Sequence, residues 1–146
     1  MAVVRLLIRL TFLLLVLGVI TAVALMLLMM DRLTGRRHNR SPVARTCFLA
    51  CCRCLGIHIS ESGTPPAEPV LLLSNHISWT DIPVLGGLME IRFLSKAEVA
   101  SWPLVGWLAQ QAGTMFIRRG GGEAAQRRQD ITRTLKAGQS VLVFPE

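Results

Sequence analysis

A histidine and an aspartate five positions apart are the residues of this chain best suited to acid–base chemistry. His76 follows an apolar run that ends at Ser74 and Asn75, and Asp81 precedes further apolar residues. We interpret this pattern as a buried strand, a turn and a helix that begins near His76. A carboxylate that reaches the imidazole would make this histidine a general base. The alternative is a helix capped by Asn75 with an incidental histidine.

Alternating apolar patterns indicate the elements that must position this pair. They predict strands over residues 70–73, 91–95, 114–117 and 140–144, and helices over residues 78–89, 97–111 and 123–137, the second helix being broken around Pro103 and Gly106. Strands that alternate with helices predict an α/β fold with a mostly parallel sheet flanked by helices. Ligands bind beyond the carboxyl ends of such strands. Four residues at strand ends could converge there: His76, Arg118, Arg119 and Glu146.

Two arginines and three glycines follow the third predicted strand. They are Arg118, Arg119 and residues 120–122. Guanidinium groups bind phosphate through paired hydrogen bonds, and glycine lets the backbone approach an anion closely. This pattern indicates an anion site, and the alternative is a solvated basic turn.

The amino end indicates attachment to a membrane. Hydrophobic residues make up 51% of the 146 residues, and the net charge is +7. No charge occurs between Leu10 and Met30, and at about 1.5 Å per residue this run matches a hydrocarbon core of about 30 Å. A cleaved signal peptide would be followed by a small-residue site, but Asp31 and Arg32 follow instead. The charges beside this run favour an anionic membrane surface, so we expect membrane lipids and no nucleic acid as partners.

The distribution of arginines predicts the orientation of this segment. Arg5 and Arg9 precede it, whereas a larger group follows: Arg32, Arg36, Arg37, Arg40 and Arg45. The positive-inside rule then places the catalytic domain on the cytoplasmic side of the inner (cytoplasmic) membrane. Because both flanks are basic, a helix that lies in the interface or enters and returns on one leaflet is an alternative.

Residues 43–59 form a second apolar segment, either a helix on the membrane or a core helix of the folded domain. It contains all four cysteines: Cys47, Cys51, Cys52 and Cys54. The spacing of Cys51 and Cys54 alone is a weak indication of zinc or redox chemistry. We expect these residues to be small apolar side chains of a helix, and we expect no metal site.

The turn-rich residues 61–69 divide the chain. We predict a membrane-anchoring segment over residues 1–60, formed by one helix or a helical hairpin, a linker over 61–69, and the amino-terminal part of an α/β domain over 70–146. The chain stops directly after a predicted parallel strand, which needs cover on both faces. We therefore expect it to be a truncated part of a longer protein.

Several short motifs resemble those of the glycerolipid acyltransferases, the PlsC-like family that includes lysophosphatidic acid acyltransferases. Asn75 and His76 with Asp81 resemble the NHxxxxD motif of the family. Lys96 resembles its lysine-containing strand end, and residues 102–107 resemble its Pro-x-x-Gly-Trp segment.

Two later segments extend this resemblance over residues 70–146. Residues 113–119 are similar to the second motif, which usually ends Phe-Ile-Asp-Arg; Arg119 matches the arginine, and Arg118 stands where aspartate is common. Residues 143–146 resemble the start of the third motif, Phe-Pro-Glu-Gly-Thr.

The resemblance implies an O-acyltransferase that moves a fatty acyl group from acyl-CoA or acyl-carrier protein, as co-substrate and without a cofactor, to the free hydroxyl of a lysophospholipid. His76 would take the hydroxyl proton, and Asp81 would orient the imidazole. The remaining residues of the motifs would bind substrate: Asn75, Lys96, Arg118, Arg119 and Glu146. The expected acceptor is lysophosphatidic acid, which would become phosphatidic acid. The alternatives are a lyso-ornithine lipid acceptor, or a non-catalytic, membrane-anchored lipid-binding protein.

Overall fold

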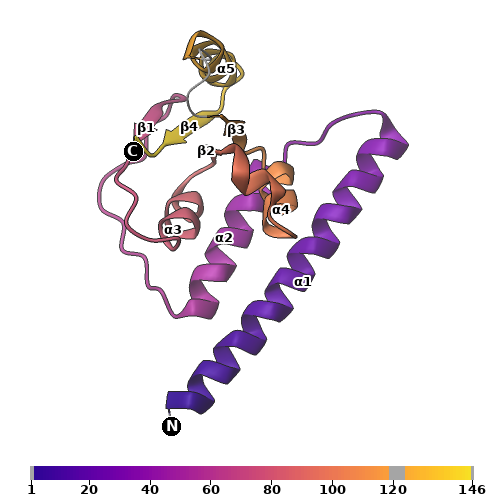
Figure 1. The fold of residues 1–146 in the computed structure, drawn as a ribbon, viewed down its shortest axis with the longest axis vertical. Helices are drawn as coiled ribbons and strands as arrows, with labels where there is room; N and C mark the ends of the chain where they lie inside the picture. The colour runs from indigo at the N-terminus through magenta and orange to yellow at the C-terminus, as the bar shows by residue number, and fades with distance from the viewer. Residues whose placement is uncertain (1, 119–123, 146) are drawn as a thin grey trace.

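A computed structural model describes residues 2–118 and 124–145 of the chain. The helices are α1 (Ala2–Thr34), α2 (Ser41–Leu55), α3 (Asp81–Leu88), the 3₁₀ helix η1 (Ala97–Ser101), α4 (Val105–Gln111) and α5 (Ala124–Lys136). The strands are β1 (Leu71–Leu73), β2 (Ile91–Lys96), β3 (Met115–Ile117) and β4 (Ser140–Val143). Figure 1 shows α5 over one face of the sheet and α2, α3 and α4 over the other.

The four strands form one parallel sheet in the order β1-β4-β2-β3. The two central strands supply most of the buried core, in which Val141 and Leu142 are 0% and 1% exposed and Ile91 and Phe93 are also buried. The prediction of an α/β fold with a parallel sheet flanked by helices is confirmed. Because all four strands are parallel, the loops that follow them meet at one edge of the sheet.

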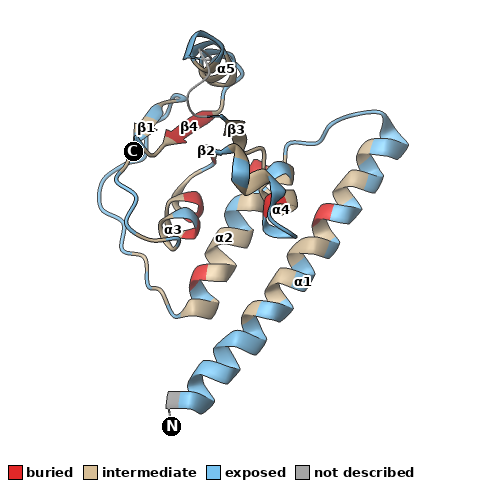
Figure 2. Ribbon diagram, in the orientation of Figure 1, coloured by how far each residue is buried: buried red, intermediate tan, exposed pale blue. Residues whose placement is uncertain are grey.

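The helix α1 is the one helix, within the described residues, that is long and apolar enough to cross a membrane. Its 33 residues extend over about 50 Å. Figure 2 shows that its amino-terminal half is exposed, whereas its carboxyl-terminal half lies against the rest of the protein. The exposed half consists largely of Leu, Val and Ile side chains, so a membrane is the environment that would bury them.

The second helix is part of the folded domain. It runs back beside α1 and lies between α1 and α3 (Figure 1). Phe48 packs edge-on against Phe93 of the sheet with 5.8 Å between ring centroids, and Cys52 is buried. Of the two interpretations of residues 43–59, the structure therefore favours the core helix.

The four cysteines lie on this helix as free thiols. Burial, reinforced by the neighbouring thiols, raises the pKa of Cys51 to about 11. A protonated thiol is a poor nucleophile and a poor metal ligand. The environment of α2 therefore fits the prediction that these cysteines serve as small apolar side chains.

The contact between α2 and α3 depends on two adjacent glycines. A β-carbon added at Gly86 would clash with the ring of Phe48, and one at Gly87 would lie 2.9 Å from Cδ2 of Leu49. The glycines let the two helices approach closely. This contact holds α3, which carries Asp81 at its first turn, at a fixed height over the sheet.

Candidate active site

His76 and Asp81 are in contact in the loop that joins β1 to α3. Nδ1 of His76 lies 3.2 Å from Oδ2 of Asp81. An ionised carboxylate only accepts hydrogen bonds, so Nδ1 carries the proton and donates it to Asp81. The other ring nitrogen, Nε2, is then left as a free acceptor, which is the protonation state that a general base requires.

The same carboxylate oxygen also organises the loop. It accepts hydrogen bonds from the amides of Ile77 at 2.8 Å and of Ser78 at 2.9 Å. These two amide bonds, that of Ser78 first, together with the imidazole, lower the pKa of Asp81 below its ordinary value. Asp81 therefore stays ionised at neutral pH, and it also lies in the first turn of α3, where the helix dipole favours a negative charge.

The prediction that the helix begins near His76 is wrong, because α3 begins at Asp81. The amides of Ile77 and Ser78 bond to the Asp81 side chain, and residues 74–80 form an irregular turn before the helix. This turn brings the carboxylate back to the imidazole, although the two residues are five positions apart. A regular helix would have placed them about one and a half turns apart.

Phe144 supports the imidazole from the neighbouring strand. β1 pairs with β4, and the first residue after β4 places its ring against His76 with 4.3 Å between ring centroids and 30° between planes. Phe93 in turn stacks on Phe144 at 6.3 Å. Phe144 was not among the predicted site residues, although it is the phenylalanine of the segment that resembles the third family motif.

Lys96 and Arg118 lie at the same edge of the sheet but farther along it. Both are exposed. Lys96 ends β2 and is in register with Ile117, and Arg118 follows β3. Strands are about 4.8 Å apart, so these residues lie on the order of 10 and 14 Å from the end of β1. Such distances suit opposite ends of one extended substrate.

Of the other predicted binding residues, only Asn75 lies within the described part of the chain. Asn75 is exposed and directly precedes His76 in the loop after β1. Arg119 and Glu146 lie outside the described residues, so their predicted roles stay predictions.

The Pro-x-x-Gly-Trp segment has a packing role. A β-carbon at Gly106 would lie 2.5 Å from the carbonyl oxygen of Val99 and 2.6 Å from that of Ala100. Glycine at this position therefore lets α4 pack directly on η1. The break predicted around Pro103 and Gly106 is confirmed as the boundary between these two helices.

A carboxylate-held histidine at the carboxyl edge of a parallel sheet has the arrangement that general base catalysis requires. The acyltransferase family model matches residues 56–146. The chain therefore belongs to the acyltransferase family, as its motifs predict.

Three curated relatives illustrate the similarity. A lyso-ornithine lipid O-acyltransferase of Pseudomonas aeruginosa is 47% identical over 107 residues, which cover 73% of this chain and 42% of that protein. A lyso-ornithine lipid O-acyltransferase of Rhodobacter capsulatus is 38% identical over 96 residues, covering 66% and 35%. A 1-acyl-sn-glycerol-3-phosphate acyltransferase of Neisseria gonorrhoeae is 33% identical over 93 residues, covering 63% and 36%. The chain thus spans 35–42% of the length of these relatives. No solved structure matches the chain significantly.

Proposed function

We propose that the protein transfers a fatty acyl group from a thioester donor, acyl-CoA or acyl-carrier protein, to the free hydroxyl of a lysolipid. The observation that carries this proposal is the hydrogen bond between His76 and Asp81, which leaves Nε2 free to accept a proton. Nε2 takes the hydroxyl proton while the oxygen attacks the thioester carbonyl. The tetrahedral intermediate then expels the thiolate, which recovers the proton from the imidazolium. The products are the acylated lipid and a free thiol.

Asp81 has two roles in this mechanism. It selects the tautomer of His76, and its negative charge stabilises the imidazolium that forms during the reaction. Positioned base catalysis of this kind typically contributes about 10²–10⁴-fold to the rate. Because the acceptor supplies its own hydroxyl, the mechanism needs no acyl-enzyme intermediate.

The favoured acceptor is lyso-ornithine lipid. Lysophosphatidic acid was the acceptor expected from the motifs, but relatives named for lyso-ornithine lipid reach 47% identity, against 33–34% for the relatives named for 1-acyl-sn-glycerol-3-phosphate. The basic residues beyond β3 suit either acceptor, because guanidinium binds carboxylate and phosphate alike. Ornithine carries a carboxylate where lysophosphatidic acid carries a phosphate.

The surroundings of the catalytic pair support a reaction at a lipid surface. Ile77 and Trp79, within the catalytic loop, are 91% and 62% exposed. Exposed apolar side chains beside a partly open His76 would contact acyl chains or the membrane interface. Together with α1 and the basic residues that follow it, they support a site at the cytoplasmic surface of the inner membrane.

The test uses full-length protein in membranes with a labelled acyl donor. The His76→Ala variant should lose transfer by about 10²-fold or more, while the amount of protein in the membrane fraction stays the same. His58→Ala is the matched control, because His58 is exposed and lies outside the site, and it should keep wild-type activity. Near-normal transfer by His76→Ala would refute the role of His76 as base.

The same assay identifies the acceptor. Lyso-ornithine lipid and lysophosphatidic acid are compared at equal surface concentration with one donor. We expect the larger kcat/KM for lyso-ornithine lipid. A larger value for lysophosphatidic acid would restore the acceptor that the motifs predict, without affecting the assignment of His76.

A further inference from the structure

A basic cavity of about 820 Å³ lies at the opposite edge of the sheet from His76. The last turn of α1, the connection from α1 to α2, and residues that precede or begin three strands line it: Gly113 before β3, Gln139 before β4, and Arg92 at the start of β2. Arg92 lies four residues before Lys96 in β2, so the two ends of the sheet's strands are about 13 Å apart along this strand. The cavity is therefore separate from the catalytic centre.

The charge of this cavity is strongly positive. Five arginines and one aspartate line it: Arg32, Arg36, Arg37, Arg40, Arg92 and Asp31. The carboxylate of Asp31 is already engaged, because it accepts hydrogen bonds from Arg40 at 2.5 Å and from the amide of His38 at 3.0 Å, and lies 2.7 Å from Nδ1 of His38. Within the described part of the chain, none of the other four arginines lies within ion-pair distance of a carboxylate.

Arg92 shows that the cavity has unused donors. Its Nε is buried and has no hydrogen-bond partner among the described residues. The guanidinium packs over Gly113, where an added β-carbon would lie 3.2 Å from its Cζ and Nε. A buried donor without a partner is costly, and an anion in the cavity would accept its hydrogen bond once the guanidinium turns away from Gly113.

An apolar cavity of about 250 Å³ adjoins the basic one. It lies between α1, α2, α4 and β2 and extends to Ile82 at the start of α3, and the two cavities share Arg40, Gln111 and Ala112 as lining residues. Arg40 donates a hydrogen bond to Gln111 at this boundary. The polar cavity and the apolar cavity together match an amphiphile, with an anionic head and a hydrocarbon chain, better than they match a free anion.

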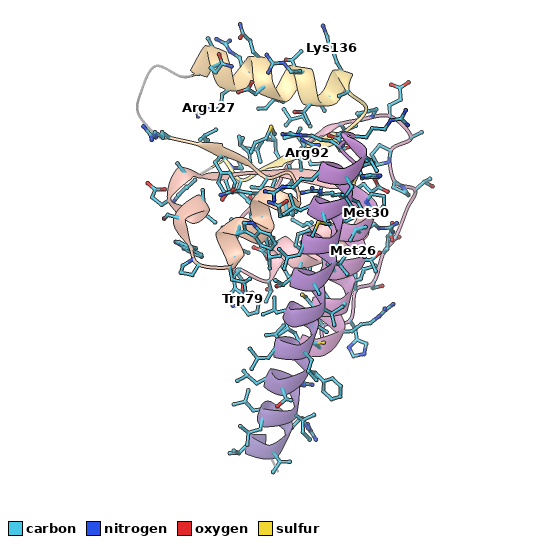
Figure 3. The ribbon with its side chains drawn as sticks, turned by 90° about the vertical axis from the view of Figure 1, so that its right-hand side faces the viewer. Met26, Met30, Trp79, Arg92, Arg127 and Lys136 are labelled. Carbon is cyan, nitrogen blue, oxygen red and sulfur yellow. The ribbon has the colours of Figure 1, made fainter. Side chains whose placement is uncertain are left out.

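We propose that the basic cavity binds the phosphate of an anionic membrane phospholipid, at a site distinct from the acyl-transfer centre. The arginines of this cavity follow the uncharged run of α1 directly. With α1 lying in the membrane interface, they would lie at headgroup depth. Figure 3 shows Arg92 beside the carboxyl-terminal end of α1, whereas Trp79 of the catalytic loop lies lower in the view, toward the amino-terminal half of α1.

The experiment measures the Tm of the full-length protein in a neutral detergent. Three ligands are compared at matched ionic strength: short-chain phosphatidylglycerol, short-chain phosphatidylcholine and inorganic phosphate. A ligand that binds only the folded state raises Tm with concentration. We expect phosphatidylglycerol to raise the Tm by a few degrees at about 100 times its Kd, and the other two to raise it far less.

Variants connect this shift to the cavity. Arg36→Gln/Arg37→Gln changes two exposed side chains and should weaken binding of phosphatidylglycerol about tenfold or more. Arg92→Gln tests the buried donor separately. The matched control is Arg128→Gln/Arg133→Gln on α5, which removes the same charge from exposed positions outside the cavity and should keep the full shift. The Tm of each variant without ligand reports whether it folds.

Three outcomes would overturn the proposal. An undiminished phosphatidylglycerol shift in the Arg36→Gln/Arg37→Gln variant would show that the cavity is not the site. An equal shift with phosphatidylcholine would show that the anionic charge is not recognised. An equal shift with inorganic phosphate at the same concentration would identify a free-phosphate site and exclude the lipid. Because the readout is Tm, these outcomes are independent of acyl transfer.

Discussion

The imidazole of His76 stacks on the ring of Phe144 with 4.3 Å between centroids. One residue follows β1 in the catalytic loop, and the other directly follows β4. Asp81 holds one nitrogen of the imidazole, and Phe144 supports its face. Two strands that are neighbours in the sheet therefore fix the orientation of one ring.

Replacing Phe144 tests this support. We expect Phe144→Leu to lower kcat about tenfold, because an aliphatic side chain keeps the apolar contact but lets the imidazole tilt, and small misplacements of a catalytic group are costly. The KM values for donor and acceptor should change little. Phe116→Leu in β3 is the control, and unchanged kcat in Phe144→Leu would show that the stack has no part in catalysis.

The two roles of Asp81 can be separated by Asp81→Asn. The amide oxygen can still accept hydrogen bonds from the amides of Ile77 and Ser78, so the loop should persist, with the Tm lowered only by the loss of the charge. The negative charge is lost, so kcat should fall by about 10²–10⁴-fold. Steady-state kinetics and thermal unfolding on the same samples check this. A fall in kcat that comes with a large fall in Tm would instead mean that Asp81 only shapes the loop.

Acid should reveal the lowered pKa of Asp81. The unfolded chain binds the proton near the ordinary pKa of 3.8, whereas the amides of Ser78 and Ile77, and then the imidazole, keep the folded carboxylate ionised to lower pH. The stability from this carboxylate is fully present above its ordinary pKa and is lost as the pH falls through the folded pKa. The difference in Tm between wild type and Asp81→Asn should be constant above about pH 5 and should shrink below about pH 4. A difference that does not vary with pH would contradict the shift.

The packing of α3 on α2 predicts that Gly86→Ala destabilises the protein. The added methyl group would overlap the ring of Phe48, and such overpacking typically lowers the free energy of unfolding by about 1–3 kcal/mol. Gly18→Ala is the control, because nothing lies within 4 Å of the new carbon there. Thermal unfolding of both variants checks this. If Gly86→Ala had the same Tm as Gly18→Ala, α2 and α3 could separate without cost.

The resemblance predicts a binding role for Arg119. Arg119→Ala should chiefly raise the apparent KM for the acceptor, because the guanidinium would hold its anionic headgroup. The KM for the thioester should change little. The reverse pattern, with an unchanged acceptor KM and a raised thioester KM, would assign this arginine to the donor.

Much of the fold could be predicted because strands and helices differ in the period of their apolar residues. The strand over residues 91–95 and the break near Gly106 appear in the structure where they were expected. The order of the strands could not be predicted, because it depends on contacts between segments far apart in the chain. Residues 43–59 could not be assigned either, since an apolar face suits a membrane and a protein core equally.

At the candidate site, residue types and spacing predicted the contact between His76 and Asp81 but not the backbone between them. Helical periodicity continues through Ser78, and only the hydrogen bonds from the amides of Ile77 and Ser78 to Asp81 show why the helix starts later. Phe144 was missed because an aromatic residue after a buried strand usually belongs to the core. Its role depends on the pairing of β1 with β4.

The pairing of β1 with β4 also has a consequence for biosynthesis. The hydrogen bond from the amide of Val70 to Ser140 Oγ joins residues 70 positions apart, so the ribosome must release β4 before the catalytic loop can find its partner. The helix α1, in contrast, is synthesised before either strand. Under the proposed function, a nascent chain would therefore reach the bilayer while it is still unable to react with acyl thioesters.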